Sequence, residues 1–245
     1  LSGVGPHDHL KRVGIHPIVL DSPHVGENLQ DHPFTPLDFT VTNQSDIDWS
    51  ANQYDIMTNA NLYDFYVNRH GPLTRYPSTA VYVATGLAGD VDWPDGLVYL
   101  LITQYNAANS IESLLDTYTR HNRNDWHRYL QPFINNNRHF WIAFCSFRPR
   151  SRGTVKLATR NPLDSPLIDL NLFAEPLDLE VGVRAAATAL RVLESSPTIA
   201  PHVRYSLLPL PGCESQYCHN QPLSACIGYL RCVGRTLTWT DFHHC

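Results

Sequence analysis

Short apolar runs separated by clusters of turn residues constrain the fold of this chain more than any other feature. From Pro33 onward, six runs follow one another, at 36–41, 63–67, 79–87, 97–104, 139–147 and 154–158. Runs of this length, rich in β-branched and aromatic residues, are typical of β-strands. We expect several of them to form one mainly antiparallel sheet of about six strands, backed by helices, in an α+β fold.

Two of these runs differ in the faces that they bury. Residues 140–145 are apolar on both alternating faces, which predicts a central strand with cover above and below. Residues 154–157 alternate between polar and apolar side chains, as a half-exposed strand does.

Helices are predicted by spacing and by their end signals. Apolar residues at helical spacing predict a helix over 177–195, with Pro176 before it and Ser195-Ser196-Pro197 after it. A weaker pattern predicts a second helix over 111–118, and 135–137 reads as a turn. Before the sheet, we expect a helix over 7–13, a strand over 15–20 and a loop over 21–26.

Composition excludes several classes of protein. The chain has 245 residues, 43% of them hydrophobic and 17% charged, which is ordinary for a globular core. The formal charge is -5 and no basic run exceeds Lys11-Arg12, so we expect no nucleic-acid partner. The longest apolar stretches fall far short of the roughly 20 residues of a membrane-spanning helix, so no membrane span is predicted.

Five of the six cysteines lie in the last 33 residues, at 213, 218, 226, 232 and 245. Zinc sites favour close pairs such as Cys-x2-Cys, which this region lacks, so disulfides are preferred over zinc and no metal site is predicted. We expect at least one disulfide among the first four of these cysteines. Together with the glycosylation acceptor Asn43-Gln44-Ser45, this favours a secreted or extracellular protein.

Both ends of the chain read as interrupted. It begins with Leu1-Ser2-Gly3-Val4-Gly5-Pro6 and ends with Phe242-His243-His244-Cys245, without an initiator Met, a signal segment or a polar tail. We therefore expect the sequence to be a piece of a larger protein.

Several short motifs together resemble one family. They are 1–6, the run Gly26-Glu27-Asn28-Leu29-Gln30-Asp31-His32, the turn 71–74, the stretch 148–153 with 161–169, and Pro211-Gly212-Cys213. In order and spacing they resemble the glucose-methanol-choline (GMC) family of flavin oxidoreductases, and in particular its insect glucose dehydrogenase-like members. The resemblance covers nearly the whole chain and implies a C-terminal fragment of such a protein.

The resemblance implies a domain organisation. Residues 1–32 would end one portion of the FAD-binding domain, 33–238 would form the substrate-binding domain, and 239–245 would start the return to the FAD domain. The dinucleotide fingerprint Gly-x-Gly-x-x-Gly does not occur in the chain, so this chain alone is not expected to hold FAD firmly.

The resemblance also implies site residues. In the family, a histidine after an aromatic residue faces the flavin, and that position is His243, after Phe242. Oxidation of an alcohol by hydride transfer releases a hydroxyl proton, and imidazole titrates in the range needed to accept it as a general base. His244 stands where the family usually has proline or a small residue. Trp239 and Phe242 would wall the substrate pocket, or simply pack in the core.

Asn28, Asp31 and His32 have two interpretations. The family resemblance places them beside the cofactor, whereas their residue types also suit a loop capped by its own side chains. A second catalytic histidine or asparagine would follow residue 245.

The implied function is that of an FAD-dependent alcohol or sugar dehydrogenase or oxidase acting on CH–OH donors. The substrate would be a sugar, a choline-like molecule or another small alcohol, and the electron acceptor a quinone, a dye or oxygen. The alternative is a secreted, disulfide-stabilised binding or structural protein of the same fold without catalysis.

Overall fold

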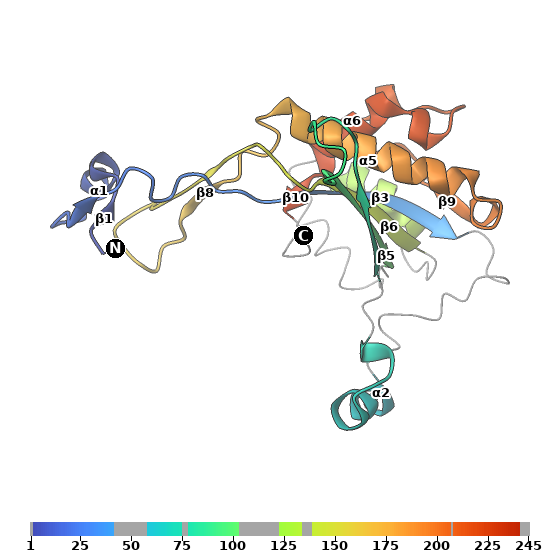
Figure 1. Cartoon of the computed structure of the whole chain (residues 1–245), viewed down its shortest axis with the longest axis horizontal. Helices are drawn as coiled ribbons and strands as arrows, with labels where there is room; N and C mark the ends of the chain where they lie inside the picture. Colours follow the sequence, from blue (N-terminus) through green and yellow to red (C-terminus); the bar gives the residue numbers. More distant parts are fainter. Residues whose placement is uncertain are drawn as a thin grey trace.

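The computed structural model describes residues 2–41, 58–74, 78–102, 123–133, 139–206 and 208–240. These residues form a body built on a sheet and a narrow arm, which carries the first residues of the chain (Figure 1). The predicted helix over 111–118, the predicted turn over 135–137 and the acceptor Asn43 lie outside the described residues.

The sheet consists of six of the described strands. They are β3 (Pro33–Val41), β4 (Ser78–Val83), β5 (Gly96–Ile102), β6 (His139–Ser146), β9 (Val203–Tyr205) and β10 (Trp239–Thr240). The order is β10-β3-β6-β5-β4, β9 pairs with the other end of β3, and every pairing is antiparallel. The predicted α+β class and antiparallel sheet are confirmed, as is the central position of the strand at 140–145.

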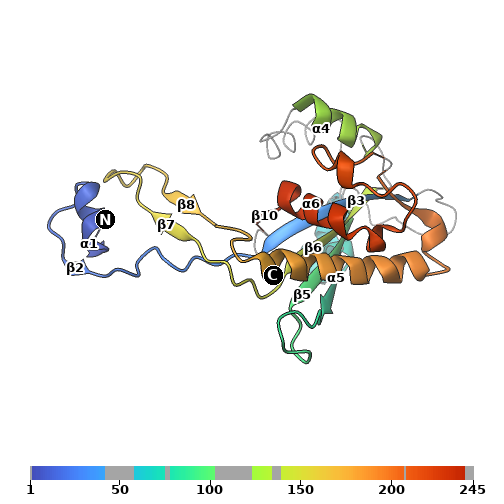
Figure 2. The same ribbon diagram turned by 90° about the horizontal axis from the view of Figure 1, so that it is seen from above.

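Two helices cover one face of this sheet (Figure 2). Helix α5 (Pro176–Ser195) packs on β5 and β6, and α6 (Ile227–Leu237) packs on α5 and β3. The core between them contains Leu37, Phe140, Phe144, Leu190 and Leu230, each at most 1% exposed. The predicted helix over 177–195 is confirmed, with Pro176 in its first turn, where a missing N–H removes no helical hydrogen bond.

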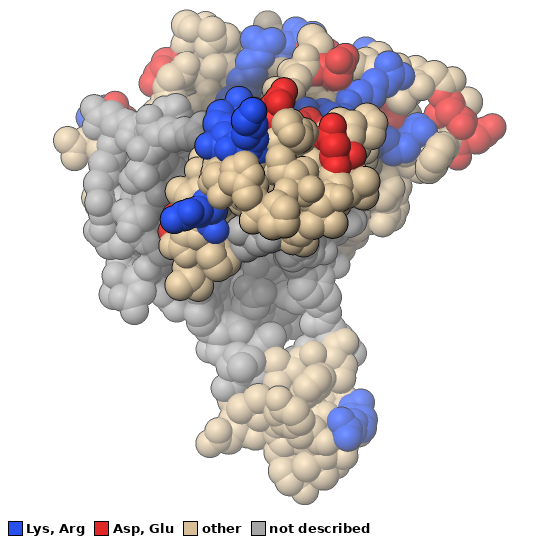
Figure 3. All heavy atoms as spheres, turned by 90° about the vertical axis from the view of Figure 1, so that its left-hand side faces the viewer, with Lys and Arg blue, Asp and Glu red and all other residues tan. Residues whose placement is uncertain are grey.

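The arm joins the first residues of the chain to a distant hairpin. It contains β1 (Val4–Gly5), α1 (His7–Arg12), β2 (Leu20–Asp21), β7 (Thr154–Lys156) and β8 (Leu167–Asp169). β1 pairs with β2 in parallel, and β7 with β8 in antiparallel. Viewed from the end of the arm, the described surface carries acidic and basic side chains interspersed (Figure 3).

The remaining described helices are short. They are α2 (Asn59–Tyr63), a π-helical turn (Asp64–Asn68), α4 (Arg123–Leu130) and 3-10 turns at Pro72–Thr74, Gln131–Phe133, Ala200–His202, Glu214–Gln216 and Leu223–Ala225. In the described parts of the chain, no helix has the length and apolar character needed to cross a membrane.

Two of the predicted strands, at 63–67 and 15–20, do not form as expected. Residues 63–67 form helix rather than strand: Thr58 caps α2 by accepting a hydrogen bond from the Asn61 N–H, and Tyr66 and Val67 remain exposed. Of the strand predicted over 15–20, only Leu20 pairs, in β2. Gly14 has a positive φ of 77°, and Pro17 has no N–H to donate to a ladder.

The predicted strand over 79–87 ends early, at Val83, because the next residues wrap around a carboxylate. Asp95 accepts hydrogen bonds from the backbone N–H and the hydroxyl of Thr85 and from the N–H of Ala88, at 2.7, 2.7 and 3.1 Å. Burial alone would raise the pKa of Asp95, but these hydrogen bonds outweigh it and lower the pKa below its ordinary value.

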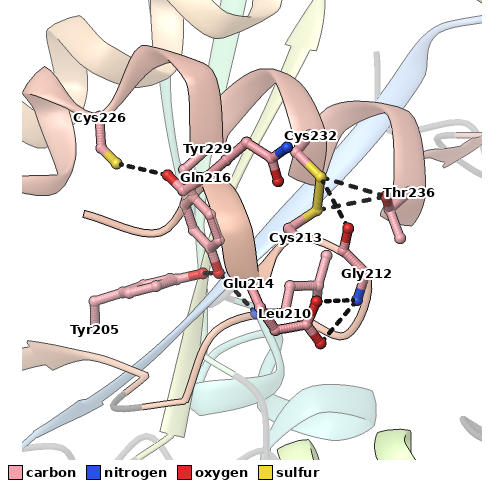
Figure 4. The surroundings of a disulfide bond; sticks show 10 residues. All are labelled: Tyr205, Leu210, Gly212, Cys213, Glu214, Gln216, Cys226, Tyr229, Cys232 and Thr236. Carbon is pink, nitrogen blue, oxygen red and sulfur yellow. Dashed lines mark hydrogen bonds between the residues drawn. A yellow bond between two sulfur atoms is a disulfide. The ribbon is translucent and has the colours of Figure 1, made fainter. Parts of the chain in front are cut away.

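Two disulfides cross-link the segment that leads into α6. Cys213 pairs with Cys232 (Figure 4), and Cys218 pairs with Cys226. The expected disulfides among these four cysteines are therefore confirmed. Cys145 is buried in β6 and forms no disulfide with another described cysteine. Within the described ranges, no three His, Cys, Asp or Glu side chains are grouped so that they could hold a metal ion.

Candidate functional site

The sheet brings two ends of the sequence together. β10 pairs with the start of β3, so that Trp239 lies opposite Phe34 and Thr240 lies opposite Pro33. Pro33 directly follows the run from Gly26 to His32. The segment that leads to the C-terminal histidines therefore runs beside the residues that follow this run.

Two threonines fix this arrangement. The hydroxyl of Thr238 donates to the carbonyl of Gly234 at the end of α6, and it also bonds to the hydroxyl of Thr35 in β3. Since the single hydroxyl proton of Thr238 goes to Gly234, the Thr35 hydroxyl must be the donor in the second bond. The exit of the chain from α6 is thereby bonded to the sheet.

The run from Gly26 to His32 is bonded in turn to a third segment, 147–153. His32 stacks on Phe147 with 5.4 Å between ring centroids, and its Nε2 lies 2.9 Å from the Phe147 carbonyl oxygen. The Gln30 amide donates to the Pro149 carbonyl at 3.0 Å. Leu29 and Gly153 exchange backbone hydrogen bonds at 2.8 and 2.9 Å.

Two glycines in these segments allow neighbouring strands β7 and β8 to approach closely. A Cβ on Gly26, where φ is 81°, would lie 2.1 Å from the Val155 carbonyl oxygen. A Cβ on Gly153 would lie 2.0 Å from the Asp169 carbonyl oxygen. Both distances are far below contact distance, so only glycine fits at either position.

A buried carboxylate ties segment 147–153 to the start of α5. Asp178, 2% exposed, accepts the backbone N–H groups of Arg150 and Ser151, each at 2.8 Å, and the Ser151 hydroxyl at 2.6 Å. Three donors on one carboxylate hold this turn against the sheet body. The run 26–32, the segment 147–153 and the start of α5 therefore form one hydrogen-bonded unit at the junction of arm and body.

Known proteins share this sequence pattern and fold. The family model described as GMC oxidoreductase matches residues 149–245. An alcohol dehydrogenase [acceptor] of Pseudomonas putida is 26% identical over 224 residues, which span 88% of this chain and 34% of that protein. These matches support the GMC oxidoreductase family for this chain.

Further relatives are found among insect proteins. A glucose dehydrogenase [FAD, quinone] of Drosophila pseudoobscura pseudoobscura is 25% identical, with 99% of this chain and 34% of the relative covered. An ecdysone oxidase of Bombyx mori is 28% identical, with 99% and 33% covered. The chain spans about a third of the length of these curated relatives.

Solved structures share the fold. A formate oxidase of Aspergillus oryzae RIB40 superposes with a TM-score of 0.64 at 21% identity, over 98% of this chain and 40% of that one. A pyridoxine 4-oxidase superposes with a TM-score of 0.57 at 18% identity, over 98% and 36%.

The candidate cofactor residues of this chain lie at the junction, in different surroundings. Asn28 adopts a left-handed conformation with φ of 61° and is exposed, and its side chain forms no hydrogen bond with the described residues. Asp31 accepts the backbone N–H of His32 at 2.8 Å, and His32 is engaged with Phe147. Asp31 therefore caps its own loop, as one of the two interpretations expects. The Asn28 amide forms no hydrogen bond within the described residues.

The C-terminal candidates are described only in part. Trp239 lies in β10, where its backbone register is defined and its side chain is not described. Phe242 and His243 lie outside the described residues, two and three positions after Thr240.

Sequence reasoning missed a polar cluster within the sheet. Asp38, 3% exposed, accepts hydrogen bonds from the Tyr129 hydroxyl at 2.8 Å and from the Trp141 indole N–H at 2.9 Å. Burial, and then the charge of Asp38, raise the pKa of Tyr129 well above its ordinary value, so Tyr129 stays a proton donor. The signal was available, because Asp38 is the one acidic residue in the apolar run 36–41.

Proposed function

We propose that this chain forms the substrate-binding part of an FAD-dependent GMC oxidoreductase that oxidises a hydroxyl group of a small alcohol or sugar. The observation that carries the proposal is the pairing of β10 with the start of β3. This pairing joins the family's run 26–32 to the segment that leads to the candidate base.

We assign the domains in the same way. Residues 1–32 and 239–245 belong to the FAD-binding domain, and 33–238 belong to the substrate-binding domain. In support of this division, the arm extends away from the sheet body, and the relatives are about three times as long as this chain.

The residues present suit one edge of an FAD site rather than a complete site. Asn28 offers an exposed amide on a loop that Asp31 and His32 hold in place through their contacts with the backbone and Phe147. The chain has no dinucleotide fingerprint, so the nucleotide portion would be held by other sequence. When bound, FAD would supply the acceptor for the hydride of the substrate.

His243 would accept the hydroxyl proton of the substrate. It lies three residues after Thr240, so the chain allows its Cα to reach about 10 Å from the end of β10. Trp239 and Phe242, on the same segment, would exclude water and hold the substrate carbon in position. A base with a pKa near neutrality is suited to this transfer, because it is unprotonated when substrate binds.

The substrate class remains that of CH–OH donors: a sugar, a choline-like molecule or another alcohol. The electron acceptor would be a quinone, a dye or oxygen. The two disulfides support a secreted or extracellular location, because disulfides persist in oxidising compartments.

The test is an absorbance spectrum of the purified full-length protein that contains this chain. We expect a bound yellow flavin, which bleaches when a matching alcohol or sugar is added without oxygen. A protein that stays colourless after FAD is supplied would refute the proposal. It would favour instead the disulfide-stabilised binding or structural protein, which the two cross-links also suit.

A further inference from the structure

A cleft of about 410 Å³ lies on the helix-covered side of the sheet, away from the candidate site. It is formed between the end of α5, strand β9 and the segment 217–223. Its apolar lining comes from Phe39, Leu193, Val203, Tyr205, Tyr217 and Leu223. Phe39 is five residues along β3 from Phe34, the partner of Trp239, which corresponds to about 17 Å of strand.

The two tyrosines of this cleft present their rings rather than their hydroxyls. The hydroxyl of Tyr205 is hydrogen-bonded to the hydroxyl of Tyr229 at 2.8 Å. The Tyr229 hydroxyl also accepts the Leu210 N–H at 2.9 Å (Figure 4). The Tyr217 hydroxyl donates to the Ser206 carbonyl at 3.2 Å. Because both hydroxyls are engaged within the protein, the cleft is lined by ring surfaces that suit a planar aromatic group.

The charge beside the cleft favours an anion. The Arg204 guanidinium is held at the lining backbone, since its Nη1 donates to the carbonyls of Ala200 and Val203 at 3.0 and 2.8 Å. No carboxylate of the described residues forms an ion pair with Arg204. The acidic residue of the lining, Glu194, instead accepts hydrogen bonds from both the N–H and the hydroxyl of Ser224.

The wall of the cleft is fixed before any ligand arrives. The Cys218–Cys226 disulfide closes the loop that carries His219 and begins directly after Tyr217, and Glu194 bonds this loop to α5 through Ser224. His219 packs against Tyr217 with 4.9 Å between ring centroids. A preformed cleft of this size, apolar with few polar groups, has the usual character of a small-molecule site.

We propose that this cleft is a second binding site, distinct from the candidate catalytic site, for a small planar aromatic anion such as an aromatic carboxylate or sulfonate. The ring would pack against Tyr205 and Tyr217, and the anionic group would bind the free N–H groups of Arg204. The site does not depend on FAD or on His243.

Fluorescence titration with anilinonaphthalene sulfonate tests this site, with neutral N-phenyl-naphthylamine as the comparison probe. We expect saturable one-to-one binding of the sulfonate. Ala200→Trp fills the cleft and should weaken binding of both probes about tenfold or more. Val192→Trp, at a 67% exposed position on α5 outside the cleft, is the matched control and should bind as the parent does.

Arg204→Gln tests the charge. It should weaken sulfonate binding about fivefold and leave the neutral probe unchanged, while Arg191→Gln on the exposed side of α5 changes neither. Gln221→Trp blocks the cleft from the opposite wall, so the site remains testable if Ala200→Trp fails to fold by circular dichroism. Parent-like sulfonate affinity in a folded blocking variant, or equal weakening of both probes by Arg204→Gln, would overturn the proposal.

Discussion

Thr35 and Thr238 are hydrogen-bonded through their hydroxyl groups although 203 residues separate them in the sequence. Thr35 is 1% exposed in β3, and Thr238 is the residue between α6 and β10. This contact fixes the point at which the chain leaves α6 and joins the sheet, and so sets the direction of the segment that leads to His243.

Thr35→Val should therefore destabilise the fold by about 1–2 kcal/mol, because valine keeps the shape and leaves the partly buried Thr238 hydroxyl without its donor. Chemical denaturation measures the loss. Thr238→Val and the double variant complete a mutant cycle, in which we expect a coupling energy of about 1 kcal/mol. Strict additivity of the two single changes would mean that the hydroxyls do not interact.

The ion pair between α5 and α6 gives a pH-dependent prediction. Arg231 donates from Nε and Nη2 to the two carboxylate oxygens of Glu180, at 2.5 and 2.8 Å. The hydrogen bonds from Arg231 lower the pKa of Glu180 below its ordinary value. A lowered folded-state pKa stabilises the protein above the unfolded-state value, and that stabilisation is lost as the pH falls through the folded value.

Glu180→Gln should then reduce the free energy of unfolding by no more than about 1 kcal/mol at pH 7, since both side chains are partly exposed. The difference from the parent should shrink below about pH 4 and vanish once Glu180 is protonated. Thermal unfolding across this range measures it. In the Arg231→Gln background the same substitution should have little effect, and a deficit that persists at low pH would contradict the ion-pair explanation.

The sheet and α5 were predictable because their signals are local. The run 140–145 is apolar on both faces and α5 has helical periodicity with proline at each end, and both form as expected. Helix α6 was missed because two glycines and Cys232 within it, and Cys226 just before it, obscure its pattern. The glycine at 234 is explained by a tertiary contact, since a Cβ there would lie 2.6 Å from Leu179 Cδ1 on α5.

The candidate site could likewise be predicted only in part from the sequence. Family motifs identified the run 26–32 and the C-terminal histidine as separate strings. The pairing of Thr240 with Pro33, which brings the segment before the histidine beside the end of this run, is a contact that no local pattern encodes. The partnering of Asp31 and His32 depends likewise on where the fold places Phe147.

The disulfide connectivity is open to direct measurement. Peptide mapping by mass spectrometry without reductant should find Cys213 linked to Cys232 and Cys218 linked to Cys226, with none of these four linked to Cys145. Removing one link, as in Cys218→Ser with Cys226→Ser, opens a loop whose ends are eight residues apart. The unfolded chain gains conformational entropy, which should cost about 2–3 kcal/mol of stability. Four free thiols in the secreted protein would contradict both the connectivity and the extracellular assignment.

The proposed base gives the most direct catalytic prediction. In the flavin-loaded full-length protein, His243→Ala should lower turnover by about 100-fold or more and leave the flavin bound, because the hydroxyl proton loses its acceptor while the cofactor contacts remain. Steady-state rates and the flavin absorbance measure the two effects separately. His244→Ala is the matched control, one residue farther along the same segment, and should turn over at close to the parent rate.

The pH profile gives a second readout, since the acidic limb that reports deprotonation of the base should disappear in His243→Ala alone. Near-normal turnover in His243→Ala together with a large loss in His244→Ala would move the base by one residue, and near-normal turnover in both would remove it from this segment.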